Sequence, residues 1–378
     1  MEKFNGKKAF SEALSSLNIK LIDRYIIKKF LGTFFFCLLL ILTIAVVFDF
    51  AEKIDNFMEK QAPVKAIIFE YYMNFIPYFA MLFAPLFVFI AVIFFTSKMA
   101  ISTEIIAILN SGMSFRRMMW PYFLSALFIA TFTYVLTNFV IPKSNLIRMD
   151  FEDKYYHSSS SKRITKQDIH RQVSKNVLVY MGTFNPISQR GQNFTIEKLD
   201  SGKLVSKLTA SSVAYDTTSH KWSAMNYYIR EIRNNEEIIT RGKQIDTTLT
   251  IKPEDFSRDA GEVGSMTSRA LNDYIDLLRL QGSDELKLFL IEKYRRFANP
   301  FAVFILTLIG VSLSSRKIRG GIGMNIGIGL TLSFSYILFL QFASQFCLKG
   351  SLGPMLAMWI PNIIYSIIAL VLYKLAPK

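Results

Sequence analysis

Cysteine and histidine are scarce in this sequence of 378 residues, which contains two cysteines and three histidines. Cys37 and Cys347 both lie within long apolar stretches, where neither a disulfide framework nor a zinc cluster is expected. His157, His170 and His220 are far apart in sequence and have no acidic or cysteine companions at ligand spacing. We therefore predict no metal site.

Short motifs of known catalytic sites are also missing. The chain has no G-x-S-x-G elbow, no H-E-x-x-H helix and no Walker motif, so we expect neither covalent catalysis nor a cofactor. A glycine-rich run over 320–329 resembles a phosphate loop, but it lacks the Lys-Ser/Thr ending and leads into an apolar segment. Gly323 and Gly327 in this run instead predict a small-residue face for close helix packing, within the chain or at a subunit interface.

Charge is absent from six long stretches of the sequence. About 20 helical residues cross a bilayer, so each stretch is long enough to be a membrane-spanning helix. Hydrophobic residues make up 51% of the chain and 34 residues are phenylalanine, which is more apolar material than a soluble domain of this size usually carries. The six uncharged stretches are 30–48, 71–97, 118–142, 297–315, 320–348 and 350–373.

Basic residues set the direction of these helices, because short loops rich in Lys and Arg stay in the cytoplasm. The N-terminal segment, the second loop with Arg116 and Arg117, and the fourth loop with Arg316 and Arg319 are all basic. We therefore expect both termini in the cytoplasm. The net charge of +15 partly reflects this arrangement, and without a nucleic-acid-binding motif it predicts no binding to RNA or DNA.

A polar stretch over 143–266 separates the third span from the fourth and is expected outside the cytoplasm. It has short runs of β-branched and aromatic residues between turn signals, a pattern typical of a sandwich or jelly roll. Four aromatic residues in these runs either line an apolar groove or form ordinary core. They are Trp222, Tyr180, Phe184 and Phe194. A helical pattern over 267–291, broken at Gly282, is expected at the outer membrane surface.

The predicted fold class is an α-helical membrane protein with six transmembrane helices and an inserted all-β, jelly-roll-like periplasmic domain. Residues 1–142 form the N-terminal membrane half, with spans at about 30–48, 71–97 and 118–142. Residues 143–266 form the β-domain. Residues 267–378 form the interfacial helix and the C-terminal membrane half, with spans at about 297–315, 322–348 and 352–373.

A short amphipathic helix is predicted at about 102–111, in the loop between the second and third spans, with Ser102 as a candidate N-cap. In one interpretation it is a surface helix, whose first-turn Glu104 complements the helix dipole. In the other it is a coupling helix that docks into a groove on a motor protein. The candidate coupling residues are Glu104, Ile105, Ile108, Leu109 and the C-cap candidate Gly112.

The run Glu104-IIAILNSGMSFRRM resembles the cytoplasmic helix of the LptF/LptG family of lipopolysaccharide export permeases. Other similar blocks are Leu21-IDRYIIKKFLGTF, Tyr294-RRFANPFAVFILTLIGVSL, and the pair Gly320-GIGMNIGIGL and Trp359-IPN. The order of three spans, a β-domain and three spans is also similar to that family, and the resemblance covers nearly the whole chain. The segment Asp23-RYIIKKFLGTF looks more like the LptG branch than the LptF branch.

The resemblance implies that two such permeases pair in the inner membrane of a diderm bacterium and bind two copies of a cytoplasmic ABC ATPase of the LptB type. It implies that they extract lipopolysaccharide from the outer leaflet and pass it to the β-domain and to a periplasmic bridge protein of the jelly-roll type. Glu104 would then contact the ATPase. The chain itself would be a transport subunit and not an enzyme.

Three basic residues near the outer end of the fourth span, Lys293, Arg295 and Arg296, oppose the positive-inside bias. Guanidinium groups bind phosphate oxygens bidentately, so these residues are candidates for binding the phosphates of lipopolysaccharide. The alternative is snorkelling to ordinary phospholipid headgroups. Lys53 is a weaker candidate because acidic residues lie beside it. Family members often carry basic residues along the first span, whereas 30–48 has none.

Other kinds of membrane protein remain as alternatives. An ion-coupled secondary transporter usually has ionisable residues near the middle of the bilayer, and the six spans lack them. A mechanotransmitting ABC subunit would have a similar cytoplasmic helix, but the basic residues on the outer side favour a lipid permease. A membrane enzyme would need a catalytic constellation, which the sequence does not contain.

Overall fold

The computed structural model describes residues 20–156, 166–174, 176–185, 188–217, 219, 221–233, 236–249, 253, 260–283, 285–316 and 321–376. The chain forms two compact units, each built from several segments. One, the helical unit, comprises Met1–Ile54, Tyr72–Ser144 and Tyr294–Lys378. The other, the β unit, comprises Asp55–Tyr71 and Asn145–Lys293.

Six helical segments in the described part of the chain are long and apolar enough to cross a membrane, which confirms the expected number. The first three have 38 to 41 residues, about twice the length that a bilayer needs, so their helices continue beyond the uncharged stretches. The segments are α2 (Leu21–Glu59), α3 (Val64–Ala66) with η1 (Ile67–Tyr72) and α4 (Met73–Ile101), α6 (Phe115–Val135) with η2 (Leu136–Val140) and α7 (Ile141–Tyr155), α10 (Leu286–Ser314), α11 (Gly321–Leu348) and α12 (Pro354–Leu375).

One apolar cluster of the helical unit joins α2, α4 and α6. Ile26, Phe30 and Phe34 of α2 are fully buried at intervals of four residues, which is the spacing of one helix face. The ring of Phe30 lies 5.7 Å from that of Phe95, and Phe95 stacks on Tyr122 at 5.3 Å. Within a bilayer such rings stabilise the contact between helices by van der Waals packing, because lipid tails are as apolar as the rings themselves.

A second cluster packs α4 against α10, α11 and α12. Glycine permits the close approach of α11 to α4: a Cβ at Gly329 would lie 2.2 Å from Cδ1 of Ile93. Polar side chains tie the same helices together. Tyr336 donates a hydrogen bond of 2.8 Å to Asn362, whose Nδ2 donates to the carbonyl oxygen of Ala298 at 3.0 Å. Such pairing satisfies polar groups that lipid cannot satisfy.

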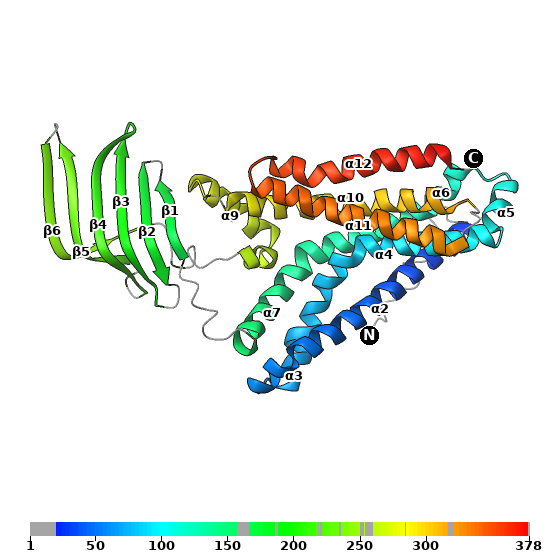
Figure 1. Cartoon of the computed structure of the whole chain (residues 1–378), viewed down its shortest axis with the longest axis horizontal. Helices are drawn as coiled ribbons and strands as arrows, with labels where there is room; N and C mark the ends of the chain where they lie inside the picture. The colour runs from blue at the N-terminus through cyan, green and yellow to red at the C-terminus, as the bar shows by residue number, and fades with distance from the viewer. Residues whose placement is uncertain are drawn as a thin grey trace, which may run out of the picture. The chain divides into compact units, whose positions relative to one another are not determined.

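Six antiparallel strands form the sheet of the β unit, and they lie side by side in chain order from β1 to β6 (Figure 1). The described strands therefore form one sheet, whereas a sandwich would have two. Consecutive hairpins explain this order, because each strand pairs with the strand that follows it. The strands are β1 (Lys166–Ser174), β2 (Val177–Asn185), β3 (Arg190–Asp200), β4 (Lys203–Asp216), β5 (Lys221–Arg233) and β6 (Glu236–Thr247).

A crease crosses this sheet. The pairing between strands skips one residue at the same level in every strand: Asp168, Gly182, Asn193, Ser211, Asn226 and Lys243. The alternation of buried residues changes phase there, since Met181 and Phe184 are three residues apart and both fully buried. Apolar side chains on the two sides of the crease consequently belong to one core. Because of this change, strict alternation over a whole strand is absent from the sequence.

The β unit also contains helical segments. Phe57 at the end of α2 contacts Tyr71 of η1 and Phe151 of α7, with ring centroids 5.7 and 5.6 Å apart. The helix α9 (Ser268–Leu280) follows η3 (Ala260–Ser265) and buries Leu271, Ile275 and Leu278, the stripe that the periodicity of the sequence indicates.

Candidate functional site

The loop between α4 and α6 contains the short helix α5 (Glu104–Asn110). Its start differs from the prediction: Ser102 caps the end of α4, and Thr103 precedes α5 with a φ of 60°. Gly112 follows α5 with a φ of +87°, a conformation that glycine adopts readily because it has no Cβ. The turn on each side of α5 is short, so α5 is held closely between α4 and α6.

The two faces of α5 have different surroundings. Ile105 is 1% exposed and packs in the cluster of α2, α4 and α6, while Ile108 and Leu109 are partly buried against that cluster. The opposite face exposes Ile106, with 49% of its surface accessible, together with Ala107 and Asn110. The residues predicted for coupling include the inward ones of α5 and none of its outward apolar residues. Apolar residues occur on both faces of α5, so the spacing of 100° per residue separates the two faces without showing which one is covered.

The N-terminal end of α2 contacts both ends of the loop that contains α5. Tyr25 donates a hydrogen bond of 3.1 Å to Oε2 of Glu104, the first residue of α5. Asp23 accepts two hydrogen bonds from the guanidinium of Arg117, in the first turn of α6, at 2.7 and 2.5 Å. Sequence analysis did not single out Asp23, Tyr25 or Arg117 as a group, since 79 to 94 residues separate the members of these pairs.

Four basic residues were predicted to bind lipid phosphates. Arg296 is only 3% exposed, so its guanidinium reaches a headgroup only after movement of neighbouring side chains, whereas Lys293 and Arg295 are partly exposed. Lys53 forms an ion pair of 2.9 Å with Asp49, four residues earlier on α2. Arg295 is consequently the arginine of this group that is better placed to meet a ligand.

Three of the four aromatic candidates lie in the core of the β-sheet. Phe184, Phe194 and Trp222 are 0% exposed and fill the apolar face. The suggestion that Tyr180 lines the same groove is wrong, because it alternates with the buried Val179 and points to the opposite face. Its hydroxyl donates a hydrogen bond of 3.0 Å to Asp168, and this bond to a carboxylate raises the pKa of Tyr180 above its ordinary value.

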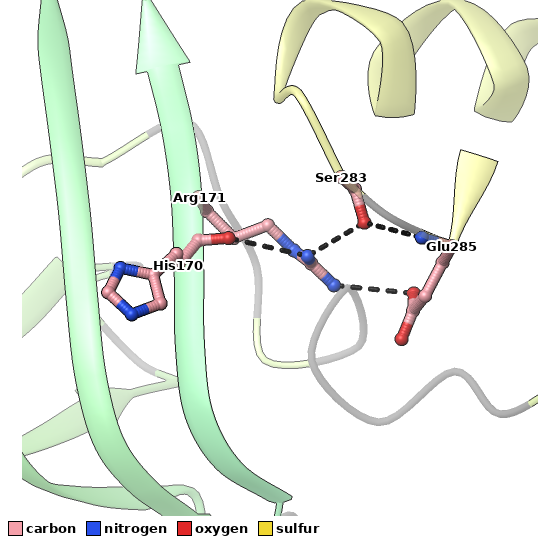
Figure 2. A network of polar contacts seen from close by, with 4 residues as sticks. All are labelled: His170, Arg171, Ser283 and Glu285. Carbon is pink, nitrogen blue, oxygen red and sulfur yellow. Dashed lines mark hydrogen bonds and ion pairs between the residues drawn. The ribbon is translucent and has the colours of Figure 1, made fainter. Parts of the chain in front are cut away.

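A polar network joins β1 to the turn between α9 and α10 (Figure 2). The side chain of Arg171 is 10% exposed, and its guanidinium donates to Oγ of Ser283 at 2.9 Å and to Glu285 at 3.3 Å. The amide of Gln172 also donates to the carbonyl oxygen of Gln281 at 3.3 Å. These bonds occupy part of the outer edge of β1.

The small-residue face of α11 does not pack within the described part of the chain. A Cβ added at Gly323 or Gly327 would meet no atom within 4 Å. Met324 and Ile328 beside them are 53% and 37% exposed. Of the two alternatives for this face, the structure therefore excludes a tight internal contact among the described residues.

Within the described ranges, no group of three His, Cys, Asp or Glu side chains is placed to hold a metal ion. Of the three histidines only His170 falls in these ranges, where its ring lies 4.6 Å from that of Tyr180. His157 and His220 lie outside the described residues.

Comparison with known proteins agrees with this architecture. The sequence matches the family described as "Lipopolysaccharide export system permease LptF/LptG" over residues 24–375, which is nearly the whole chain. No curated protein matches it in sequence. The match includes α5, all six candidate spans and the inserted sheet. The chain therefore belongs to the LptF/LptG family of lipopolysaccharide export permeases.

Proposed function

We propose that this chain is the subunit that links ATP hydrolysis by a separate cytoplasmic ABC ATPase of the LptB type to the extraction of lipopolysaccharide from the inner membrane. The lipid leaves the outer leaflet, enters the β-domain in the periplasm and passes to a bridge protein. Both termini and α5 lie in the cytoplasm. The observation that best supports this role is the exposed face of α5, where Ile106 and Ala107 offer an apolar contact next to Glu104.

An ATPase groove would receive this face of α5. An amphipathic helix binds a groove through its apolar side chains, and a carboxylate at its edge pairs with a cation of the partner. Ile105, Ile108 and Leu109 support the helix from behind by packing on the membrane helices. Gly112 lets the chain turn back into α6.

A second permease of the same family pairs with this chain along α11. Gly323 and Gly327 support this step, because helices associate closely in membranes where small residues leave the backbone accessible. Acyl chains of the lipid then lie between the paired subunits. Their phosphates meet Arg295, with Lys293 nearby in the sequence and Arg296 and Lys53 as further candidates.

The bridge protein adds to the sheet at β6. The two edges of the described sheet differ: β1 is partly covered by Gln281 and Arg171, while β6 pairs within the described residues with β5 alone. An exposed strand edge is a template for a strand of another chain. The interior between the two sides of the crease, filled by Phe184, Phe194 and Trp222, would open to shelter acyl chains.

The test is purification of the tagged protein in mild detergent, followed by mass spectrometry of the proteins and lipids that co-purify. Wild type should bring down a small ATPase and lipid A species. Glu104→Arg should lose the ATPase, whereas Glu52→Arg, which reverses another exposed carboxylate, should keep it. Arg295→Ala should reduce the bound lipid.

Two outcomes would count against this function. If wild type recovers neither ATPase nor lipopolysaccharide, the coupling role is wrong. If it recovers the ATPase without lipid, the chain is better described as a mechanotransmitting subunit that acts on periplasmic partners.

A further inference from the structure

The helix α5 has no covalent link to α2 other than through α4, whereas it joins α4 and α6 directly. The turn Ser102–Thr103 connects it to α4, and residues 111–114 connect it to α6. Any movement that a partner imposes on α5 therefore reaches α4 and α6 through the backbone. It reaches the base of α2 directly only through non-covalent contacts.

Besides apolar packing of Ile105 in the shared cluster, these contacts include two polar ones from a single turn of α2. Asp23 and Tyr25 bind groups on opposite sides of α5: Tyr25 holds Glu104 at its start, and Asp23 holds Arg117 beyond its end. A single turn thus spans the whole coupling element. One contact holds α5 itself, and the other holds the start of α6, to which the short segment 111–114 joins α5, so the two together resist rotation of this element relative to α2.

The carboxylate of Asp23 is buried and held in place by several hydrogen bonds. It is 1% exposed and accepts three hydrogen bonds, two from Arg117 and one of 2.9 Å from the backbone amide of Lys20. The amide of Lys20 is one of the donors that a helix start leaves unsatisfied, so the same carboxylate caps α2 and binds α6. Bidentate pairing with a guanidinium also fixes direction, which a single contact with an ammonium does not.

The part of α2 beyond Leu38 is only loosely packed, so it can follow a movement of the N-terminal end of the helix. Its buried face is interrupted after Leu38: no residue from 39 to 54 is buried, and the next buried residue of α2 is Phe57. Leu39 and Phe48 are 62% and 72% exposed. A shift of the base of α2 would therefore meet little packing between Leu38 and Phe57, where Phe57 again contacts Tyr71 and Phe151.

We propose that Asp23, Tyr25 and Arg117 latch the coupling helix to α2, so that α2 is moved directly when the partner ATPase moves α5. This inference rests on the proposed function, because it assumes an ATPase that engages α5. The three residues are positioning residues: they touch neither ATP nor lipid and act through Glu104 and α5.

The first experiment measures ATP hydrolysed per lipopolysaccharide released by the full complex in proteoliposomes. Asp23→Asn and Arg117→Gln should each raise this ratio several-fold while the ATPase stays bound, and the double variant should be no worse than either single variant. Arg116→Gln is the matched control, since Arg116 is exposed and its loss removes the same charge one residue away. Arg117→Lys should restore part of the coupling.

A further variant, Tyr25→Phe, should fold normally, because it removes only one hydroxyl from a side chain that is 41% exposed. It therefore tests the latch even if the other variants misfold. It should raise the ratio without lowering the yield of the complex. If Asp23→Asn, Arg117→Gln and Tyr25→Phe all match Arg116→Gln with the ATPase bound, the latch is overturned while the proposed function stands.

The second experiment measures the movement of α2. Spin labels are placed at the exposed positions Leu39 on α2 and Phe128 on α6, after Cys37→Ser and Cys347→Ser, and the distance between them is compared before and after trapping with ADP and vanadate. The distance should change in wild type, and this change should shrink in Arg117→Gln. If the distance between the labels does not change in a wild-type complex that binds the ATPase and traps nucleotide, the latch is overturned. The proposed function would still stand. A wild type that binds no ATPase overturns the proposed function and the inference with it.

Discussion

Arg171 and Glu285 are 114 residues apart in sequence, yet their side chains meet at 3.3 Å and join β1 to the start of α10 (Figure 2). The sheet lies in the sequence between the third and fourth candidate spans, and this contact ties its first strand to the residues just before α10. Ser283 shares the same guanidinium at 2.9 Å. The pair is therefore a joint between the insertion and the chain that follows it.

Replacing Arg171 with Ala should loosen this joint. The loss of hydrogen bonds to a largely buried guanidinium costs about 1–3 kcal/mol, at the lower end here because Glu285 is 39% exposed. Hydrogen exchange should become faster in β1 and in the turn at 281–285. Arg241→Ala on the exposed β6 is the control, and equal exchange in the two variants would contradict the role of Arg171.

Trp222→Ala should unfold the sheet or weaken it severely. Trp222 is 0% exposed and its ring lies 5.1 Å from that of Tyr215, so its removal creates a cavity that costs about 3–5 kcal/mol. Thermal unfolding of the β unit, followed by near-ultraviolet circular dichroism, measures the loss. Met225→Ala, at a site with 41% exposure, should change the midpoint little. A small shift for Trp222→Ala would mean that the interior is open rather than packed.

The sequence predicted the parts of the fold that depend on local pattern. Six uncharged stretches predicted six spans, and turn signals between β-branched runs predicted the inserted strands. The stripe of Leu271, Ile275 and Leu278 on α9 followed from helical spacing. Each of these features is set by neighbours within a few residues, so periodicity is enough to find it.

Features that depend on distant residues were not predictable in this way. The crease needs a kink at the same level in six strands, and only the sheet register shows that Asp168 and Asn226 are at one level. Asp23 and Arg117 could not be paired from the sequence, because nothing in either local pattern refers to the other. The outward face of α5 was missed for a different reason: apolar residues surround the helix, so the sequence did not tell which side was covered.

Two glycines of α11 should respond oppositely to the same substitution. Gly329→Ala places a Cβ 2.2 Å from Ile93, which is 1% exposed and cannot withdraw freely, so overpacking should cost about 1–3 kcal/mol. Gly323→Ala meets no atom within 4 Å and should leave the isolated subunit as stable as wild type or slightly more stable. Thermal unfolding in detergent compares the two.

Pairing with a second permease adds a further readout for these glycines. Gly323→Ala should weaken the association of the two permeases, measured by their co-purification, because the added methyl group separates the helices. If it pairs as well as wild type, the contact between permeases lies on another face.

Ile105 and Ile106 are neighbours with opposite exposure, 1% and 49%, and this difference separates folding from docking. Ile105→Asp buries a charge among apolar residues, so it should destabilise the protein by several kcal/mol and lower its yield in the membrane. Ile106→Asp places the charge at the surface, where it should leave the unfolding temperature unchanged but abolish co-purification of the ATPase by desolvating a carboxylate at the interface. Ile106→Leu is the matched control and should retain binding. Binding that survives Ile106→Asp would mean that the partner does not use the outward face of α5, and that Glu104 acts from the edge alone.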